Sequence, residues 1–193
     1  MVHTGSYLVG VFDGAKVVGA SFAFPSIEPD IHLHSHMTAF IESHRDRGLG
    51  TLVKNHQWKW AKEHGYNSIT WTFDPLVRRN ARLNILKLGA DLVSYHENFY
   101  GNMADELNNG DESDRMMVRW DLTPQNPIPR AEITEPPYDA ELIALPADIV
   151  EIRRTDPELN NQWREQVRTA FQEAFENGKN VVGFTAHNEY VLE

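Results

Sequence analysis

The sequence predicts a mixed α/β fold in which helices cover a mixed sheet and a further helical and strand section follows. Strand-like and helix-like segments alternate in the order β-β-β-α-β-α-β-β up to residue 122. A glycine-containing stretch lies at a strand-to-helix junction, and a proline-rich stretch follows residue 122. We therefore expect a core over residues 1–122, an extended linker over 123–139, and an extension over 140–193 that packs on the core or on a partner chain.

The composition is that of an ordinary soluble globular protein, with 193 residues, 41% of them hydrophobic and 24% charged. A formal net charge of -10 argues against nucleic acid or an anionic membrane as partner, because both require a basic face. Without cysteine, the chain offers no disulfide, thiolate nucleophile or zinc knuckle. No signal peptide or transmembrane run is recognisable, so we expect a cytoplasmic location.

Three strands are expected first. Tyr7–Phe12 and Lys16–Phe24 are rich in β-branched and aromatic residues and flank an Asp13-Gly14 turn, which predicts a hairpin. After two prolines, Ile31–Ile41 alternates as a third strand. Alternation places four of its side chains on one face: His32, His34, His36 and Thr38.

An amphipathic helix is expected next, with Gly65 placed to end it. Its apolar stripe comprises Leu49, Leu52, Val53, His56 and Trp60. Lys54, Lys59 and Lys62 fall outside this stripe, so we expect them to face solvent.

Alternating Ser68–Phe73 predicts a half-buried strand that ends at Asp74-Pro75. Leu76–Leu88 predicts a second helix, closed by Gly89. Asp91–Tyr100 and Arg115–Leu122 are the remaining strands expected in the core.

In the extension, Glu141–Leu145 predicts a short strand, Pro146 precedes a short helix, and Asp156-Pro157 opens a longer helix. The predicted inward stripe of that helix is Leu159, Trp163, Val167, Ala170, Phe171 and Ala174. Such a stripe packs on the protein or, if exposed, forms a dimer interface. Val181–Phe184 and Tyr190–Leu192 are expected as closing strands.

The stretch from Arg45 to Thr51 has the features of a phosphate-binding turn. Its two glycines permit close approach of the backbone, and the first turn of the following helix offers unpaired N–H groups. The stretch is not a Walker loop, because no Gly-Lys-Ser/Thr follows, and it lacks the three-glycine spacing of a dinucleotide fingerprint. We interpret it as a pyrophosphate site.

Arg45, Gly48 and Gly50 fit the pattern Gln/Arg-x-x-Gly-x-Gly/Ala, and together with the order of the flanking elements they resemble the GNAT superfamily of acyl-CoA N-acyltransferases. The resemblance runs from about Tyr7 to Leu122 and implies a mostly antiparallel mixed sheet flanked by helices. Several strings are similar to one bacterial branch of predicted acetyltransferases: Leu33-His34-Ser35-His36-Met37-Thr38, Thr70-Trp71-Thr72-Phe73-Asp74-Pro75-Leu76, Arg79-Asn80-Ala81, Leu83-Asn84, Leu88-Gly89-Ala90, Asn98-Phe99-Tyr100-Gly101 and Ser113-Asp114-Arg115.

The resemblance implies direct attack of an amine on the thioester of acyl-CoA in a ternary complex, with no metal. It places the pantetheine and thioester along backbone groups of Thr38, Ala39 and Phe40. The arginine side chains add charge-assisted bonds to the pyrophosphate, and Asn80 and Asn84 are expected to bond the CoA arm. The expected pyrophosphate loop is Arg45, Asp46, Arg47, Gly48, Leu49, Gly50 and Thr51.

The branch is linked with N-succinyl amino acid metabolism, which implies acetyl-CoA or succinyl-CoA as donor and a small-molecule amine, an amino acid, as acceptor. A homodimer is a further expectation. Two departures favour an alternative, a non-catalytic CoA-binding or dimerising module. The family's first strand and two helices are missing before the hairpin, and Ile85 stands where many members carry the tyrosine that protonates the leaving thiolate.

His36, nearest the expected thioester, is the candidate general base because imidazole titrates near neutrality. A metal on His32, His34 and His36 is not expected, because this spacing spreads them over about 13 Å of strand. Glu42 and Asp74 are carboxylate alternatives, Asp74 being favoured as a helix cap. Tyr100 or Tyr95 are candidate acids for the thiolate. The cluster of Arg78, Arg79 and Arg82 either reads an anion or is a solvated face.

Overall fold

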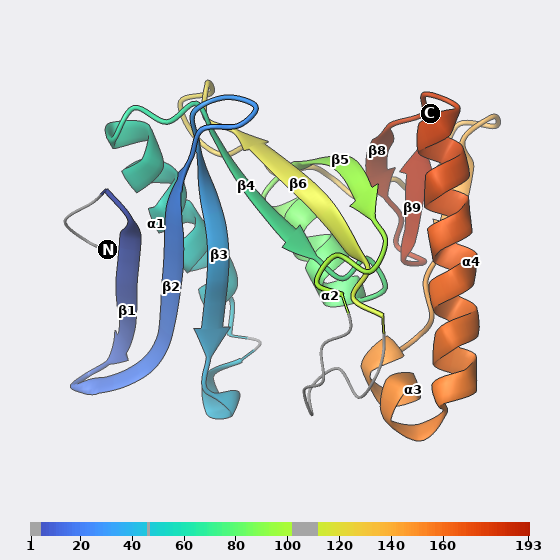
Figure 1. Ribbon diagram of the computed structural model, residues 1–193, viewed down its shortest axis with the longest axis horizontal. Coiled ribbons are helices and arrows are strands. Elements are labelled where there is room, and N and C mark those ends of the chain that lie inside the picture. The colour runs from blue at the N-terminus through green and yellow to red at the C-terminus, as the bar shows by residue number, and fades with distance from the viewer. Residues whose placement is uncertain (1–4, 46, 102–111) are drawn as a thin grey trace. The chain divides into compact units, whose positions relative to one another are not determined.

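The structure is a computed structural model that describes residues 5–45, 47–101 and 112–193 (Figure 1). The chain forms two compact units. The first contains Met1–Trp71 and Arg119–Ile128, and the second contains Thr72–Val118 and Pro129–Glu193. Two of the three boundaries fall inside strands β4 (Ser68–Phe73) and β6 (Arg115–Asp121), and the third lies between Ile128 and Pro129.

In the first unit, β1 (Tyr7–Asp13), β2 (Lys16–Ser26) and β3 (His32–Phe40) pair antiparallel in sequence order. The predicted hairpin and third strand are confirmed within two residues at each end. Gly14 has φ 58°, the left-handed conformation that the tight turn between β1 and β2 requires and that glycine adopts without strain.

Strand β3 contains a bulge at His36. Met37 pairs with Phe22 and Ser35 pairs with Ala23, so one residue of β3 has no partner opposite it. A bulge re-aims the side chains around it and often lies beside a functional site. The strict alternation expected along this strand is therefore interrupted at the histidine proposed as general base.

Helix α1 (Leu49–Glu63) connects β3 to the parallel strand β4. These two strands pair at two positions, Leu33 with Ile69 and His34 with Thr70. Beyond His34, β3 continues for six residues without a β4 partner, so its edge offers unpaired backbone groups there.

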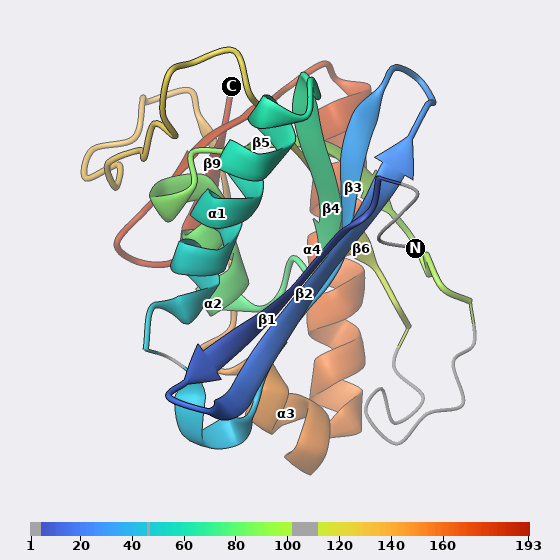
Figure 2. The ribbon, with the colours of Figure 1, turned by 90° about the vertical axis from the view of Figure 1, so that its left-hand side faces the viewer.

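Helix α1 lies against one face of β1–β3 (Figure 2). The expected apolar stripe is wrong at Leu52, which is exposed. His56 is exposed as well, but its Nδ1 lies 3.0 Å from the Tyr7 hydroxyl of β1. The expectation that Lys54 faces solvent is also wrong, since this lysine is only 7% exposed. The buried face of the helix comprises Val53, Lys54, Gln57, Trp58 and Ala61.

In the second unit, the predicted second helix is present as one α-helical turn, α2 (Arg78–Ala81), followed by a π-helical turn, η3 (Arg82–Lys87). Gly89 follows with φ 67°, which ends the helix. Strand β5 (Asp91–His96) is shorter than predicted because the chain turns at Asn98, which has φ 42°.

The C-terminal section forms a small sheet, ordered β7-β9-β8, from β7 (Glu141–Ala144), β8 (Val181–Phe184) and β9 (Glu189–Leu192). Two helices follow β7 and precede β8 along the chain, α3 (Ile149–Thr155) and α4 (Pro157–Glu176). The predicted start of α4 is confirmed, because the Asp156 side chain caps Leu159 N–H and Pro157 occupies the first turn.

The hydrogen-bonded strand order of the larger sheet is β1-β2-β3-β4-β6-β5, a mixed, mostly antiparallel sheet with helices beside it.

In the C-terminal section, Phe171 of α4 packs edge-to-face on Tyr190 of β9, with ring centroids 4.9 Å apart. Both side chains are fully buried, so α4 and the small sheet share one core.

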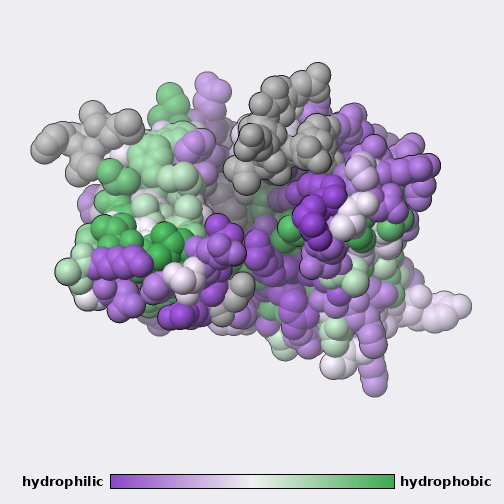
Figure 3. Space-filling view, turned by 90° about the horizontal axis from the view of Figure 1, so that it is seen from below, coloured by the Kyte–Doolittle hydropathy of each residue, from purple (hydrophilic) through white to green (hydrophobic). Residues whose placement is uncertain are grey.

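Large apolar side chains are exposed on the β1–β2 hairpin: Leu8, Phe12 and Val17. Figure 3 shows hydrophobic side chains gathered at the side of the molecule where Figure 1 places that hairpin. Within the described part of the chain, no helix is both long enough and apolar enough to cross a membrane.

Candidate functional site

The first unit brings the open edge of β3 and the start of α1 together at the predicted phosphate-binding turn. Gly48 precedes the helix with φ 76°, and no side chain caps the first turn. No acidic residue lies in that turn either. The amide N–H groups at the helix start therefore lack intrahelical acceptors, and the helix dipole favours an anion there.

The arginines of this turn are exposed. Arg45 donates from Nε to the Phe40 carbonyl oxygen at 3.3 Å, which ties the turn to the end of β3. Arg47 is exposed as well, so both guanidinium groups lie at the surface beside the turn. Asp46, predicted as part of the loop, lies outside the described residues.

The three residues predicted to face the pantetheine lie at the end of β3. Thr38 bonds through Oγ1 to Ser21 Oγ at 2.9 Å, which fixes its side chain on the β2 side. Phe40 packs over Gly19, where a Cβ atom would come within 2.4 Å of its ring. Ala39 is exposed between them. Side-chain contacts to β2 thus hold this part of β3 in place.

The three histidines of β3 have different surroundings. His32 is buried and its Nδ1 lies 2.8 Å from the Asp30 carbonyl oxygen. His34 Nδ1 lies 3.0 Å from Thr70 Oγ1, and burial, followed by the charges of His32, His36 and Lys54, lowers its pKa. His36 is exposed, and its ring centroid lies 5.6 Å from that of Phe24. Within the described ranges, no three His, Cys, Asp or Glu side chains form a metal-binding group.

A polar cluster that the sequence did not suggest lies between α1 and the sheet. Lys54 donates from Nζ to Ser35 Oγ at 2.8 Å and to Gln57 Oε1 at 3.3 Å. Its Nζ also lies 3.8 Å from the ring centroid of Trp71. Burial lowers the pKa of this lysine to about 7. One feature of the sequence could have indicated that Lys54 is buried. Val53, Gln57 and Ala61 are spaced four residues apart and form one face of the helix, and Lys54 is next to that face.

Asp74, a carboxylate alternative in the sequence, is engaged in the second unit. It accepts two hydrogen bonds from Arg164, at 3.0 and 3.2 Å, and one from Arg153 at 2.7 Å. It also accepts a hydrogen bond from Leu76 N–H at 3.0 Å, but the predicted helix cap is wrong, because the N-cap of α2 is Val77 and no side chain caps it. Burial alone raises the pKa of Asp74, but the charge and bonds of Arg164 and the charge of Arg153 hold it below its ordinary value. This carboxylate is thus not a free general base.

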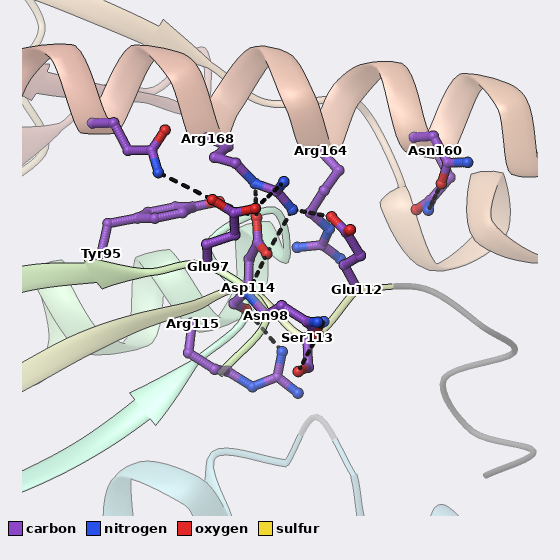
Figure 4. A network of polar contacts seen from close by, with 12 residues as sticks. Tyr95, Glu97, Asn98, Glu112, Ser113, Asp114, Arg115, Asn160, Arg164 and Arg168 are labelled. Atoms are coloured by element: carbon purple, nitrogen blue, oxygen red, sulfur yellow. Dashed lines mark hydrogen bonds and ion pairs between the residues drawn. The ribbon is translucent and has the colours of Figure 1, made fainter. Parts of the chain in front are cut away.

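Tyr100 follows the turn at Asn98, and Figure 4 shows Asn98 and Asp114 beside Arg168 of α4. Its N–H donates to Ser113 Oγ at 2.8 Å, and the N–H of Asn98 donates to Asp114 Oδ1 at 3.0 Å. Arg168 of α4 donates two hydrogen bonds of 2.9 Å to the buried Asp114 carboxylate. The Tyr100 hydroxyl is 3.3 Å from Thr72 Oγ1, and its side chain remains 46% exposed.

Tyr95, the alternative thiolate acid, donates its hydroxyl proton to Asp114 at 2.6 Å. Burial, reinforced by this bond and by the negative charge of Asp114, raises its pKa far above the ordinary value. The proton is therefore committed within the network, and Tyr95 is a poor acid for a leaving group.

The remaining predicted residues also lie in the second unit. Asn80 is half-buried, and Asn84 is only 3% exposed inside the π-helical turn, so Asn84 does not lie on the helix surface as expected. The arginine cluster is dispersed. Arg78 donates to the Leu145 carbonyl oxygen at 3.0 Å, and Arg82 pairs with Glu132, which leaves Arg79 as the exposed member.

The structure is similar to solved acetyltransferase structures. A Bacillus subtilis acetyltransferase in complex with CoA matches with a TM-score of 0.52 and 18% identity, over 60% of this chain and 76% of that one. An IAA acetyltransferase from Bacillus cereus matches with 0.53 and 16%, over 60% and 77%. A GNAT family acetyltransferase from Elizabethkingia anophelis with acetyl-CoA bound matches with 0.50 and 20%, over 62% and 78%.

No protein-family model and no curated protein matches the chain. The structural similarity covers about three fifths of the chain. Because the sequence identity is low, the similarity establishes the fold alone. The antiparallel β1–β3 and the parallel β3–α1–β4 unit belong to this shared architecture, and the chain has the GNAT fold.

Proposed function

We propose that the protein is an acyl-CoA-dependent N-acyltransferase that moves an acetyl or succinyl group to the amine of a small molecule, an amino acid. The observation that carries the proposal is the uncapped start of α1 behind Gly48, next to the unpaired edge of β3. The first feature suits a pyrophosphate, and the second offers backbone hydrogen bonds to an extended pantetheine. Two of the similar structures contain CoA or acetyl-CoA.

The choice between donors and the nature of the acceptor rest on sequence resemblance alone. Among the predicted catalytic residues, His36 lies on the bulged part of β3 in the first unit. Tyr100, Asn80 and Asn84 belong to the second unit, and their roles stay predictions, as does a homodimer.

Replacing Gly48 with arginine is expected to weaken CoA binding by at least about 100-fold, or roughly 3 kcal/mol. The new side chain occupies the space in front of the helix amides. In addition, residue 48 has a backbone φ of 76°, which glycine adopts more readily than arginine. Isothermal titration calorimetry with CoA measures the change. Gly14→Arg is the matched control, since Gly14 also has a positive φ and open space around it. Equal affinities for parent and Gly48→Arg would remove the basis of the proposal.

The reaction itself is tested by mass spectrometry of purified protein incubated with acetyl-CoA or succinyl-CoA and pooled amino acids. Formation of an N-acylated product together with free CoA identifies donor and acceptor in one experiment. Binding of CoA without product from any donor would instead favour a non-catalytic CoA-binding module.

His36→Ala is expected to lower kcat most strongly at the acidic end of the pH range, where little of the acceptor amine is unprotonated and a general base matters most. A pH series of kcat for the parent and the variant measures this. His64→Ala, an exposed histidine at the end of α1, is the control. A uniform loss at every pH would assign His36 to packing against Phe22 and Phe24.

A further inference from the structure

The Lys54 cluster lies where β3 and β4 separate. The last pair between these strands is His34 with Thr70, and the next residue on each strand is Ser35 and Trp71. These are the two residues of the strands that Lys54 contacts, at 2.8 Å and 3.8 Å. The ammonium group therefore marks the first position at which the edge of β3 is open.

Lys54 is buried at an unusual site for a cation. Its three N–H bonds have three acceptors: the Ser35 hydroxyl, the Gln57 amide oxygen and the face of Trp71. Gln57 is fully buried, and within the described residues its Nε2 has no hydrogen-bond partner. A buried donor without a partner calls for an explanation, and a bound acceptor beside Lys54 supplies one.

We propose that Lys54, acting through Ser35, supplies the proton that the CoA thiolate takes up as the amide forms. This inference rests on the proposed function, and it names an acid for the leaving thiolate, a role for which Ile85 has no proton to give. The C–N bond forms as the C–S bond breaks, and the amine gives its proton to the general base. Ser35 gives its hydroxyl proton to the thiolate and receives one from Lys54, which becomes neutral and is recharged from solvent between turnovers.

The acidity of the pair suits this step. A thiol titrates near pH 8.5 and an ordinary lysine near 10.4, so an ordinary lysine would hold its proton in competition with a thiolate. Burial lowers the pKa of Lys54 to about 7, which makes it a stronger acid than the thiol it would form. Burial is the cause of this shift, and no charged neighbour among the described residues offsets it.

Among the groups that face Lys54, Lys54 itself is the one that carries a proton to donate near neutral pH. On α1 the neighbour is the neutral Gln57, and on β4 it is the neutral Trp71. On β3, Ser35 is neutral, and the titratable His34 has its pKa lowered by burial and then by the charges of His32, His36 and Lys54. His34 therefore adds little positive charge beside Lys54 near neutral pH.

The test is the pH profile of kcat for Lys54→Met, Lys54→Arg and Ser35→Ala, with the exposed Lys59→Met on the same helix as control. In the parent, kcat is expected to fall as pH rises through about 7, where Lys54 loses its proton. Lys54→Met is expected to lower kcat by about 100-fold, to lose this fall, and to leave KM for acyl-CoA nearly unchanged. Lys54→Arg keeps the charge but holds its proton too tightly to donate, so the same loss is expected.

Restored turnover in Lys54→Arg would overturn proton donation in favour of a purely electrostatic role. A Lys54→Met kcat within about threefold of the parent at every pH would overturn the inference and leave the proposed function intact. Absence of turnover in the parent would overturn both. Thermal unfolding of each variant checks that the fold is retained.

Discussion

Replacing Arg164 with methionine is expected to lower the free energy of unfolding by about 3–5 kcal/mol, because the substitution leaves the buried Asp74 carboxylate without its bidentate partner. The Arg164 side chain is 4% exposed and the Asp74 side chain 12%. Their two bonds join α4 to the end of β4 in the second unit. Arg153 and Leu76 N–H remain as partners of Asp74 but do not replace a bidentate guanidinium. Urea unfolding at neutral pH measures the loss.

The pH dependence of this loss identifies the carboxylate as its source. The pKa of Asp74 lies below its ordinary value of about 4 in the folded protein, so the pair contributes stability above that pH. The contribution disappears as pH falls through the folded pKa, and the difference between parent and Arg164→Met is expected to shrink there. Arg154→Met breaks an exposed pair with Glu151 and should change stability little. A loss of the same size in both variants would contradict the assignment.

The parts of the fold that the sequence predicted correctly are those whose conformation is determined by neighbouring residues in the chain. The Asp13-Gly14 turn, the Ser68–Phe73 strand and the Asp156-Pro157 helix start each depend on residues adjacent in sequence, although the strand is buried on both faces and not half-buried as predicted. Their conformations follow from turn geometry, strand periodicity and capping, and tertiary contacts do not alter them. The conformation of the turn before α1 belongs to the same class, since the positive φ of Gly48 is a local requirement.

The errors arise where partners distant in sequence decide which side chains are buried. Arg164 lies on the buried face of α4, where the apolar pattern had placed Leu159 and Trp163, because its charge is satisfied by Asp74, ninety positions away. Lys54 is buried because Ser35 and Trp71 provide acceptors on two different strands. Hydropathy treats both residues as solvent-facing, so neither could be located without the three-dimensional contacts.

The bulge at His36 is a third feature that periodicity does not report. An extra residue in one strand changes the pairing with β2 without changing composition or local propensity. The π-helical turn around Asn84 has a similar effect, because it shifts the face on which a residue lies. The conformation of the candidate site is therefore predictable at the turn before α1 but not at the residues around the point where β3 and β4 separate.

Lys54→Met is expected to make the unfolding free energy less dependent on pH above neutrality. The pKa of Lys54 is about 7 in the folded protein and 10.5 as its ordinary value, so between these limits the unfolded chain binds a proton that the folded chain does not. Stability of the parent therefore rises with pH across this window, and the full cost of the buried charge applies below about pH 7. Three to four pKa units correspond to about 4–5 kcal/mol.

The variant also leaves Ser35 and Gln57 without their shared partner, which costs about 1–3 kcal/mol at every pH. The diagnostic quantity is accordingly the slope: the advantage of Lys54→Met over the parent should be largest near pH 7 and fall steadily toward pH 10.5. Urea unfolding at intervals across this range measures it, with the exposed Lys59→Met as the reference for a flat difference. A flat difference for Lys54→Met as well would mean that Lys54 keeps an ordinary pKa, and would remove the acidity on which proton donation to the thiolate depends.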